Sequence, residues 1–498
     1  MLRSTVPPRA GWSFLAAALL AGCTTVGPDF KNPAPPTVTG YTAGTLPAAT
    51  ASAPGTLGAA QRFGNSTAVS EQWWTAFGSP RLNALIQQAL ANSPTLQAAQ
   101  ATLRQAQETY RAQAGSTLYP TVNAKLGASR NGVNASQQGQ PGNSQHIYNL
   151  YNAGIGVNYN LDLFGGNRRA LEALAAQADY QAYQLAGARL TLAANVATTA
   201  FAQAQLGAQI QATETIAKAQ ADELGITRQR LHLGAASLVD VLSLQTQYQQ
   251  TLASLPPLRN KLQQADHLLS ALLGQAPGQA EIPRFELADF RLPAELPLVV
   301  PSELVRQRPD VQASTALLHA ATAQYGVAVS NLYPQINLSA TLGTQALTTG
   351  ALFGPGSMVW SLAGSLAQPL FNAGLRAGAS AAEANLQAAG ANYRETVLQA
   401  LRNVADALRQ LDNDAQTLQA QTAADDAAQQ SLKLVQQQYS LGAASYLQLL
   451  TAQQQAQSAR IQLLAAQAAR LSDTAALYQA MGGGVLTQAH AKGTATVS

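Results

Sequence analysis

Apolar and polar positions along the chain follow two different periods, and the periods come in the same order in both halves. Residues 80–114 and 303–330 carry apolar side chains at the spacing of an amphipathic helix, and each stretch is followed by a Tyr-Pro pair. After the first pair, Val122, Ala124 and Leu126 are separated by single polar residues. A period of two is typical of strands with one apolar and one polar face. Each half is therefore predicted to contain a helix followed by strands.

Four amphipathic strands are predicted, two in each half, with long Gly- and Asn-rich segments between the members of each pair. They cover residues 117–133, 147–164, 334–345 and 357–371, and the last alternates less cleanly than the others. An apolar sheet face has to be covered by helices or by lipid. A soluble two-layer protein and a sheet in a membrane are both compatible with the strands alone. In lipid, an open sheet edge would leave backbone groups unpaired, and known single-chain barrels begin at about eight strands, so several copies would have to share one barrel.

The longest predicted elements are two helical runs without internal proline, at 168–232 and 376–440. At about 1.5 Å per residue each would reach roughly 100 Å, which is too long for a compact layered domain. The second run carries a coiled-coil seam, with residues three and four positions apart. The seam residues are Leu401, Val404, Leu408, Leu411, Ala415 and Leu418. Return helices are expected to end at 274 and 482.

The two halves are a tandem repeat. The five residues from Leu233 to Ser237 recur letter for letter from Leu441 to Ser445, each time at the end of a long helical run. The glycine suits the end of one helix and the serine the start of the next, which predicts a sharp helical hairpin. We assign the first repeat to residues 71–290 and the second to 291–484.

The N-terminus has the features of a bacterial lipoprotein signal. Residues 1–22 combine two arginines with a short apolar stretch that is too short to span a bilayer, and Cys23, the only cysteine, follows directly. The segment resembles a lipobox, which implies lipidation of Cys23 and, because Thr24 follows, sorting to the outer membrane. Residues 23–70, rich in proline and alanine, are expected to form a lipid-anchored tether, and residues 485–498 a disordered tail.

Composition and charge exclude several functions. Charged residues make up 11% of the chain and the formal net charge is only +4, without basic clusters, so no nucleic-acid partner is expected. The five histidines are dispersed, and neither a zinc-ligand spacing, a phosphate-binding loop nor a nucleophile elbow is present. We predict no enzymatic activity, no metal site and no cofactor.

Several segments, in this order, resemble the outer-membrane factors, a TolC-like family, and are closer to its OprM and NodT lipoprotein branch. They are Glu71-Gln72-Trp73-Trp74-Thr75-Ala76-Phe77, Asn92-Ser93-Pro94, Leu161-Asp162-Leu163-Phe164-Gly165, Arg306-Gln307-Arg308-Pro309-Asp310 and Gln368-Pro369-Leu370-Phe371, together with the two hairpin tips. The resemblance covers essentially the whole mature chain. It implies an α+β membrane protein, built from a tandem-duplicated unit of two strands and long helical hairpins. Three copies of it would share a 12-strand β-barrel, which an α-helical tunnel continues into the periplasm.

The resemblance also implies partners and functional residues. The partners are two further copies of the chain, a periplasmic adaptor protein, an inner-membrane pump of the proton-driven RND type, and outer-membrane lipid. The expected adaptor-docking tips are Gly234, Ala235, Ala236, Ser237 and Leu238 in the first repeat and Gly442, Ala443, Ala444, Ser445 and Tyr446 in the second. The expected periplasmic gate is Tyr439, Leu447, Gln448 and Thr451.

The expected gate differs from the family at two positions where acidic residues are common. Gln448 and Thr451 are neutral, and only the first repeat keeps an acid near its tip, Asp240. We therefore expect a leucine plug at Leu447 with a neutral polar collar. Asp425 and Asp426 lie further up the descending helix, and Asp425 falls in the phase of the seam. One interpretation turns either of them toward the lumen, and the expected one is a solvated surface pair.

The function predicted from these features is the outer-membrane channel of a tripartite efflux system, through which small molecules leave passively while the pump supplies the energy. Two alternatives remain open at the level of sequence. One is the exit duct of an ATP-driven protein-secretion system. The other is a non-conducting lipoprotein or adhesin stalk, which would have the helices but no need for four barrel strands.

Overall fold

The computed structural model describes residues 25–484 apart from 43, 45–46, 66–68, 135–144 and 280. The chain divides into two compact units, and each unit is built from three separate segments. The first unit contains the N-terminal segment up to Pro33 with Thr102–Gln181 and Ser314–Tyr393, and the second contains Ala34–Ala101, Ala182–Ala313 and the chain from Arg394 onward. Each unit takes segments from both sequence repeats. The predicted signal peptide, Cys23 and the predicted tail lie outside the described residues.

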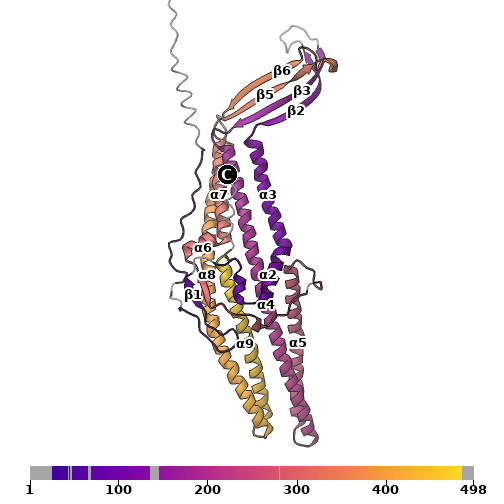
Figure 1. Cartoon of the computed structure of the whole chain (residues 1–498), viewed down its shortest axis with the longest axis vertical. Coiled ribbons are helices and arrows are strands. Elements are labelled where there is room, and N and C mark those ends of the chain that lie inside the picture. Colours follow the sequence, from indigo (N-terminus) through magenta and orange to yellow (C-terminus); the bar gives the residue numbers. More distant parts are fainter. Residues whose placement is uncertain are drawn as a thin grey trace, which may run out of the picture. The chain divides into compact units, whose positions relative to one another are not determined.

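The first unit contains a four-stranded antiparallel sheet in the order β2-β3-β5-β6 (Figure 1). The strands are β2 (Thr121–Asn134), β3 (Gln145–Leu161), β5 (Gln335–Ala346) and β6 (Met358–Ala367). The two repeats meet where β3 pairs with β5, in a register that runs from Tyr151 opposite Ala346 to Leu161 opposite Ile336. Among the described residues, β2 and β6 each pair on one side only. The sheet therefore has two unpaired edges.

One face of this sheet is apolar across all four strands. The register places apolar residues directly opposite apolar residues of the neighbouring strand, and directly opposed residues share a face. One such row is Val122, Val157, Ala340 and Leu362. Large side chains on this face are uncovered: Leu126 is 86% exposed and Trp360 is 74% exposed. A continuous exposed apolar face of this kind is typical of a surface that meets lipid or another protein.

The opposite face of the sheet is mainly polar, and small side chains predominate in its middle rows. A row on this face is Asn123, Gly156, Thr341 and Ser361. Gly154 and Gly343 stand opposite each other, and a Cβ atom on Gly343 would lie 2.7 Å from the Cα atom of Gly154. Side chains are excluded at this pair because the two backbones approach too closely.

Two of the predicted helices are interrupted by a proline. The helical stretches expected at 80–114 and 303–330 are each two helices, because they break before Pro94 and Pro309. The residue before each proline is extended, as steric contact with the proline ring requires. The observed helices are α2 (Pro80–Asn92), α3 (Pro94–Thr117), α6 (Pro301–Gln307) and α7 (Pro309–Ser330). β2 begins at Thr121 rather than at 117, because α3 continues to Thr117 and the chain turns at Pro120 before the strand.

Two long helical hairpins dominate the helical part of the chain (Figure 1). They are α4 (Gly166–His232) with α5 (Leu238–Leu272), and α8 (Ala373–Ser440) with α9 (Tyr446–Ala480). The long helices α4 and α8 begin in the first unit and continue into the second. Within the described residues, no helix combines the length and the apolarity that a membrane crossing requires.

The main core lies in the second unit. Trp73 and Phe77 come from the 3₁₀ helix η1 (Trp73–Phe77), and both are fully buried there. Trp73 stacks on Tyr478 with 5.5 Å between the ring centroids, and Phe77 packs on Phe201 at 5.0 Å. The seam residues Val404, Leu408 and Leu411 of α8 belong to the same cluster. The tryptophan-rich segment that carries part of the family resemblance is therefore a packing element.

Residues 47–65 pack within the second unit, which corrects the expectation of a free tether for this stretch. Arg470 of α9 is completely buried, and its guanidinium donates to the carbonyl oxygens of Leu57 and Ala59, at 3.1 Å each. It also donates to Thr50 Oγ1 and Gln61 Oε1. Next to this contact, β1 (Arg62–Asn65) pairs in parallel with β4 (Glu295–Leu298). Backbone hydrogen bonding to one buried arginine supplies the order that an apolar-poor segment cannot supply through burial.

Two carboxyl groups, Asp414 of α8 and Asp473 of α9, meet near Arg470. Burial and the hydrogen-bonded carboxyl group of Asp414 raise the pKa of Asp473 to about 7. Two carboxyl groups can hydrogen-bond only if one of them carries a proton, so the pair carries one negative charge below a pH of about 7 and loses the shared proton above it. The positive charge of Arg470, which interacts with Asp414, balances that single charge.

This pair makes the stability of the second unit depend on pH. Because the pKa of Asp473 is higher in the folded protein than the ordinary aspartate value, the folded state binds more protons between about pH 4 and pH 7. The free energy of unfolding should therefore fall as pH rises through this window and stay level above it. We expect Asp473→Asn to flatten the curve and to be more stable than the unsubstituted protein at pH 8, as measured by thermal unfolding in detergent.

The matched control for this prediction is Asp426→Asn, which changes an exposed aspartate of α8. It should leave the pH dependence of the melting temperature unchanged. If Asp473→Asn and the unsubstituted protein melted in parallel over the whole pH range, the shared proton would be ruled out.

Candidate functional site at the hairpin tips

The turn between α4 and α5 is built by a glycine and a serine. Gly234 has a φ of 73°, the left-handed conformation that only glycine adopts without strain, and the Ala235 amide donates back to the carbonyl of Arg230 at 2.8 Å. Ser237 then caps α5: its Oγ accepts from the Asp240 amide at 3.1 Å, and the Asp240 carboxylate accepts from the Ser237 amide. This reciprocal pair is a capping box. The carboxylate of Asp240 is therefore occupied by the cap of α5.

The second tip repeats this geometry with an amide in place of the acid. Gly442 has a φ of 78°, and the Ala443 amide donates to the carbonyl of Gln438 at 2.8 Å. Ser445 caps α9, and the Gln448 side-chain oxygen accepts from the Ser445 amide at 2.7 Å. Of the predicted gate residues, Gln448 therefore has its side chain in the helix cap.

Both tips expose leucine and small side chains. Leu441 is 83% exposed and Leu447 is 70% exposed, while Leu233, Leu238 and Val239 are their exposed counterparts at the first tip. Apolar side chains clustered at one end of a hairpin lose contact with water when a partner covers them. The tips therefore offer apolar contacts around a rigid, internally hydrogen-bonded turn.

Behind the tips, aromatic side chains take part in the contact between the two hairpins. The rings of Tyr439 and Tyr446 meet edge to face at 6.4 Å within the second hairpin. Arg230 of the first hairpin places its guanidinium carbon 5.6 Å from the centre of the Tyr439 ring. Tyr446 also packs against a small apolar cluster formed by Leu224, Val241 and Leu244 of the first hairpin. Tyr446 was predicted as a tip residue, and the structure places it in this inter-hairpin contact.

Two hydrogen bonds connect the hairpins further from the tips. Gln453 Nε2 donates to Glu223 Oε2 at 2.5 Å, and Gln454 Nε2 donates to Gln247 Oε1 at 3.1 Å. Burial raises the pKa of Glu223, while the bond from Gln453 lowers it. Burial also raises the pKa of Tyr446 to about 12, and its hydroxyl has no hydrogen-bond partner. Sequence reasoning missed Glu223 and Gln453, because their pairing joins positions 230 residues apart.

The predicted gate residues do not form one contact cluster. Tyr439 lies in the inter-hairpin contact, whereas Leu447 and Thr451 are exposed on α9, and the Thr451 hydroxyl donates to the Leu447 carbonyl of its own helix. We name Glu223, Arg230, Tyr439, Tyr446 and Gln453 the inter-hairpin cluster. These five side chains, rather than a ring of acids, hold the two hairpins together near the tips.

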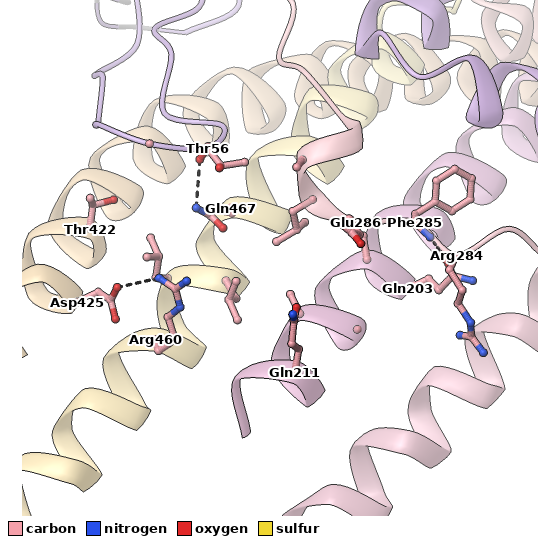
Figure 2. Close-up of a pocket in the computed structure, with 18 of the residues that line it drawn as sticks. Thr56, Gln203, Gln211, Arg284, Phe285, Glu286, Thr422, Asp425, Arg460 and Gln467 are labelled. Atoms are coloured by element: carbon pink, nitrogen blue, oxygen red, sulfur yellow. Dashed lines mark hydrogen bonds and ion pairs between the residues drawn. The ribbon is translucent and has the colours of Figure 1, made fainter. Parts of the chain in front are cut away.

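Asp425 and Asp426 differ, which corrects the expected solvated pair. Asp425 is buried and accepts from Arg460 at 3.1 Å, whereas Asp426 is exposed. Figure 2 shows Asp425 and Arg460 facing each other at one side of a pocket that lies between the hairpins. The pocket holds about 610 Å³, and Gln203, Gln211 and Gln467 contribute amide groups to it. A second pocket of about 550 Å³ shares Gln211 and Arg460 with it.

These pockets do not contain a recognisable catalytic arrangement. Gln467 donates to the Thr56 carbonyl, and Gln203 donates to Asp266, so both amides serve packing contacts. Within the part of the chain that the structure describes, no three His, Cys, Asp or Glu side chains are placed to hold a metal ion.

Cys23 lies outside the described residues, but the segment that follows it is fixed to the first unit. The Val26 amide donates to the Phe164 carbonyl at 3.0 Å, at the junction of β3 and α4. Arg169 of α4 is nearly buried and binds Asp29 at 2.6 Å and Glu172 at 2.7 Å. Val26 therefore lies beside the end of β3.

Comparisons with known proteins agree with this architecture. A family profile described as outer membrane efflux protein matches residues 85–275 and 300–483. The chain is 31% identical over 478 residues to the probable efflux pump outer membrane protein TtgC of Pseudomonas putida, with 94% of each chain covered.

Solved structures are also similar to the chain. The outer-membrane channel OprN has a TM-score of 0.83 at 26% identity, and the match covers 93% of this chain and 100% of that one. The open-state MtrE outer membrane channel of Neisseria gonorrhoeae has a TM-score of 0.79 at 26% identity, covering 93% of this chain and 99% of that one.

The cap at the second tip can be tested by hydrogen exchange. Ser445→Ala removes the side-chain acceptor of the cap, which should cost about 1 kcal/mol and raise the exchange rate of the first-turn amides of α9 about fivefold. Ser440→Ala, which changes an exposed serine at the end of α8, is the matched control and should leave exchange in α9 unchanged. Equal exchange in both variants would show that the turn does not depend on its serine cap.

Proposed function

We propose, from the premise that the chain belongs to the outer membrane efflux protein family, that three copies close into one passage through which small molecules leave the cell. The chain is the outer-membrane component of an efflux system, as its family indicates. The trimer, the shared 12-strand barrel and the helical tunnel are the proposal. The observation that carries it is the amphipathic sheet with two unpaired edges.

The dimensions and faces of the sheet fit a membrane wall. A transmembrane strand needs about 9–11 residues, and β6, the shortest of the four, has 10. The exposed apolar face would meet lipid, and the polar face would line water. In hydrocarbon, an unpaired strand edge leaves N–H and C=O groups without partners, so β2 of one copy would have to pair with β6 of the next. The number three comes from the resemblance to outer-membrane factors rather than from the sheet.

Lipidation of Cys23 fits this placement. Val26 and Asp29 are held beside the end of β3, where a barrel strand would leave the membrane. A lipid on Cys23 would then enter the membrane close to the place where β3 leaves it, without a long tether. We propose that the acyl chains and the sheet anchor the protein together in the outer membrane.

The hairpin tips are the proposed docking surface for a periplasmic adaptor, which would connect the passage to an inner-membrane pump of the RND type. Exposed leucines on both tips supply apolar contact, and the capping boxes keep the turns rigid. A preformed turn loses little conformational entropy on binding. Energy for transport would come from the pump, since the chain is a passive exit and no enzymatic role is proposed for it.

Closure of the passage is assigned to the inter-hairpin cluster together with Leu447. Opening the inner end requires the two hairpins to separate, which would break the Glu223–Gln453 hydrogen bond and the Arg230–Tyr439 contact. Leu447, Gln448 and Thr451 would form the neutral rim of the opening. A rim of this kind closes by apolar contact rather than by a ring of carboxylates.

The relatives favour small-molecule efflux over a protein-secretion duct, because TtgC is described as part of an efflux pump. A non-conducting stalk would have no use for a sheet whose apolar face is exposed over four strands.

Native mass spectrometry of the detergent-extracted mature protein tests the assembly. We expect a trimer in which every chain carries the mass of a lipid on Cys23. Cys23→Ala should remain trimeric and lose the lipid mass, because the barrel rather than the lipid holds the copies together. A lipidated monomer would contradict the shared barrel.

Conductance in planar lipid bilayers tests the closure. Tyr439→Ala and Gln453→Ala should each raise the fraction of time that the channel conducts, because they remove contacts that exist only in the closed arrangement. Thr246→Ala is the matched control, since its exposed hydroxyl bonds only to the carbonyl of Leu242 in its own helix. If both variants behaved like this control, closure would have to reside elsewhere, for example at Leu447.

A further inference from the structure

Charge is distributed very unevenly over the sheet. The four strands contain no aspartate or glutamate within the residues described for β2, β3, β5 and β6. Their only lysine and arginine are Lys125 and Arg130, both on β2. Because they are an odd number of positions apart, the two side chains lie on opposite faces of the sheet.

Lys125 belongs to the polar face. It stands opposite Gly154 on β3, and Gly154 stands opposite Gly343 on β5. Lys125 is exposed, and the glycines beside it carry no side chain that could cover its ammonium group. No carboxylate lies on this face of the described strands to neutralise it. The lysine therefore projects over a smooth, neutral surface.

Along the direction of the strands, Lys125 lies at the same height as the exposed apolar side chains of the other face. Its neighbours on β2, Ala124 and Leu126, point to the apolar face, and the row of Ala124 continues to Trp360 on β6. Lys125 thus lies on the watery side of the sheet at the depth where the other side would meet hydrocarbon. A low-dielectric wall behind a charge confines its field to the water in front of it.

Arg130 has the opposite orientation. It stands opposite Asn149, near the far end of β2, and shares its face with Leu126. There it would point away from the passage, toward the polar border of the membrane. Arg130 therefore offers a positive charge on the same strand that should not act on ions inside.

We propose that Lys125 gives the barrel section of the passage a preference for anions, so that anionic and neutral molecules pass this wall more readily than cations of the same size. The proposal rests on the proposed function, because three copies of Lys125 form a ring only if the sheet closes. Rings of basic residues are a general means of anion selection in pores. No acidic side chain on the described strands opposes the ring.

Ionic strength sets the range of this effect. The Debye length is about 30 Å at about 0.01 M salt and about 3 Å at about 1 M. In a wide passage, the lysine ring should influence ions near the axis at low salt and only those near the wall at high salt. The selectivity due to Lys125 should therefore fade as salt concentration rises.

The experiment is the zero-current potential of the purified full-length protein in neutral planar bilayers under a KCl gradient. Lys125→Gln should lower the ratio of chloride to potassium permeability about sevenfold at low salt, because a potential of about one kT raises the chloride concentration and lowers the potassium concentration by about 2.7-fold each. Lys125→Glu should lower it further, and Lys125→Arg should keep it. Arg130→Gln is the matched control and should match the unsubstituted protein.

Comparison among variants isolates Lys125 from the charges elsewhere along the passage, because every other residue is constant. Variants that conduct normally but share one zero-current potential at low salt would overturn the proposal. A potential that shifts equally in Arg130→Gln would also overturn it, since the effect would then not depend on the face of the sheet. Absence of any conductance in the unsubstituted trimer would instead contradict the proposed function.

Discussion

The hydrogen bonding of strand backbone is the constraint on which the rest of this protein depends. Each strand of the sheet carries N–H and C=O groups that must be paired wherever water is absent. Within one chain, hydrogen bonds join β2 to β3, β3 to β5 and β5 to β6, and the outer edges of β2 and β6 stay unpaired among the described residues. A passage through a membrane then requires further copies to complete those bonds, and the number of three in the proposal comes from the resemblance to outer-membrane factors.

The tandem repeat serves the same requirement. Each repeat contributes a hairpin of two strands, and β3 and β5 join the hairpins inside one chain. Because the repeats combine in this way, neither one is a compact unit by itself, and both units draw on both halves of the sequence. Side chains at equivalent positions are then free to diverge. The capping acid Asp240 corresponds to the amide Gln448, and the geometry of the turn is kept while the charge is lost.

Polar groups buried in the second unit give its helices specific neighbours. Arg470 holds four oxygen atoms of the segment 50–61, and Asp425 holds Arg460 between α8 and α9. Removing one member of such a set leaves the other buried and unpaired, which costs more than an exposed pair would contribute. The apolar cluster near the tips, around Leu224, Val241 and Leu244, is much smaller than the main core.

Local pattern determined the elements of this protein, since strand period, helix length, and the glycine and serine of the tips act over a few residues. The long helices lie at Gly166–His232 and Ala373–Ser440, close to the predicted 168–232 and 376–440. The proline breaks at Pro94 and Pro309 were also readable from the sequence, although the helical spacing on either side concealed them. The resemblance to a family added the assembly and the partners, which no pattern within one chain specifies.

Tertiary structure alone decided which polar residues are paired. Asp425 and Asp426 are neighbours of the same residue type, yet Asp425 is buried against Arg460 and Asp426 is exposed. Glu223 meets Gln453, and Arg470 meets the segment around Leu57, across hundreds of residues. These choices depend on how distant helices pack, because a side chain reaches only a few ångströms and its partner is set by the fold rather than by its neighbours in the chain.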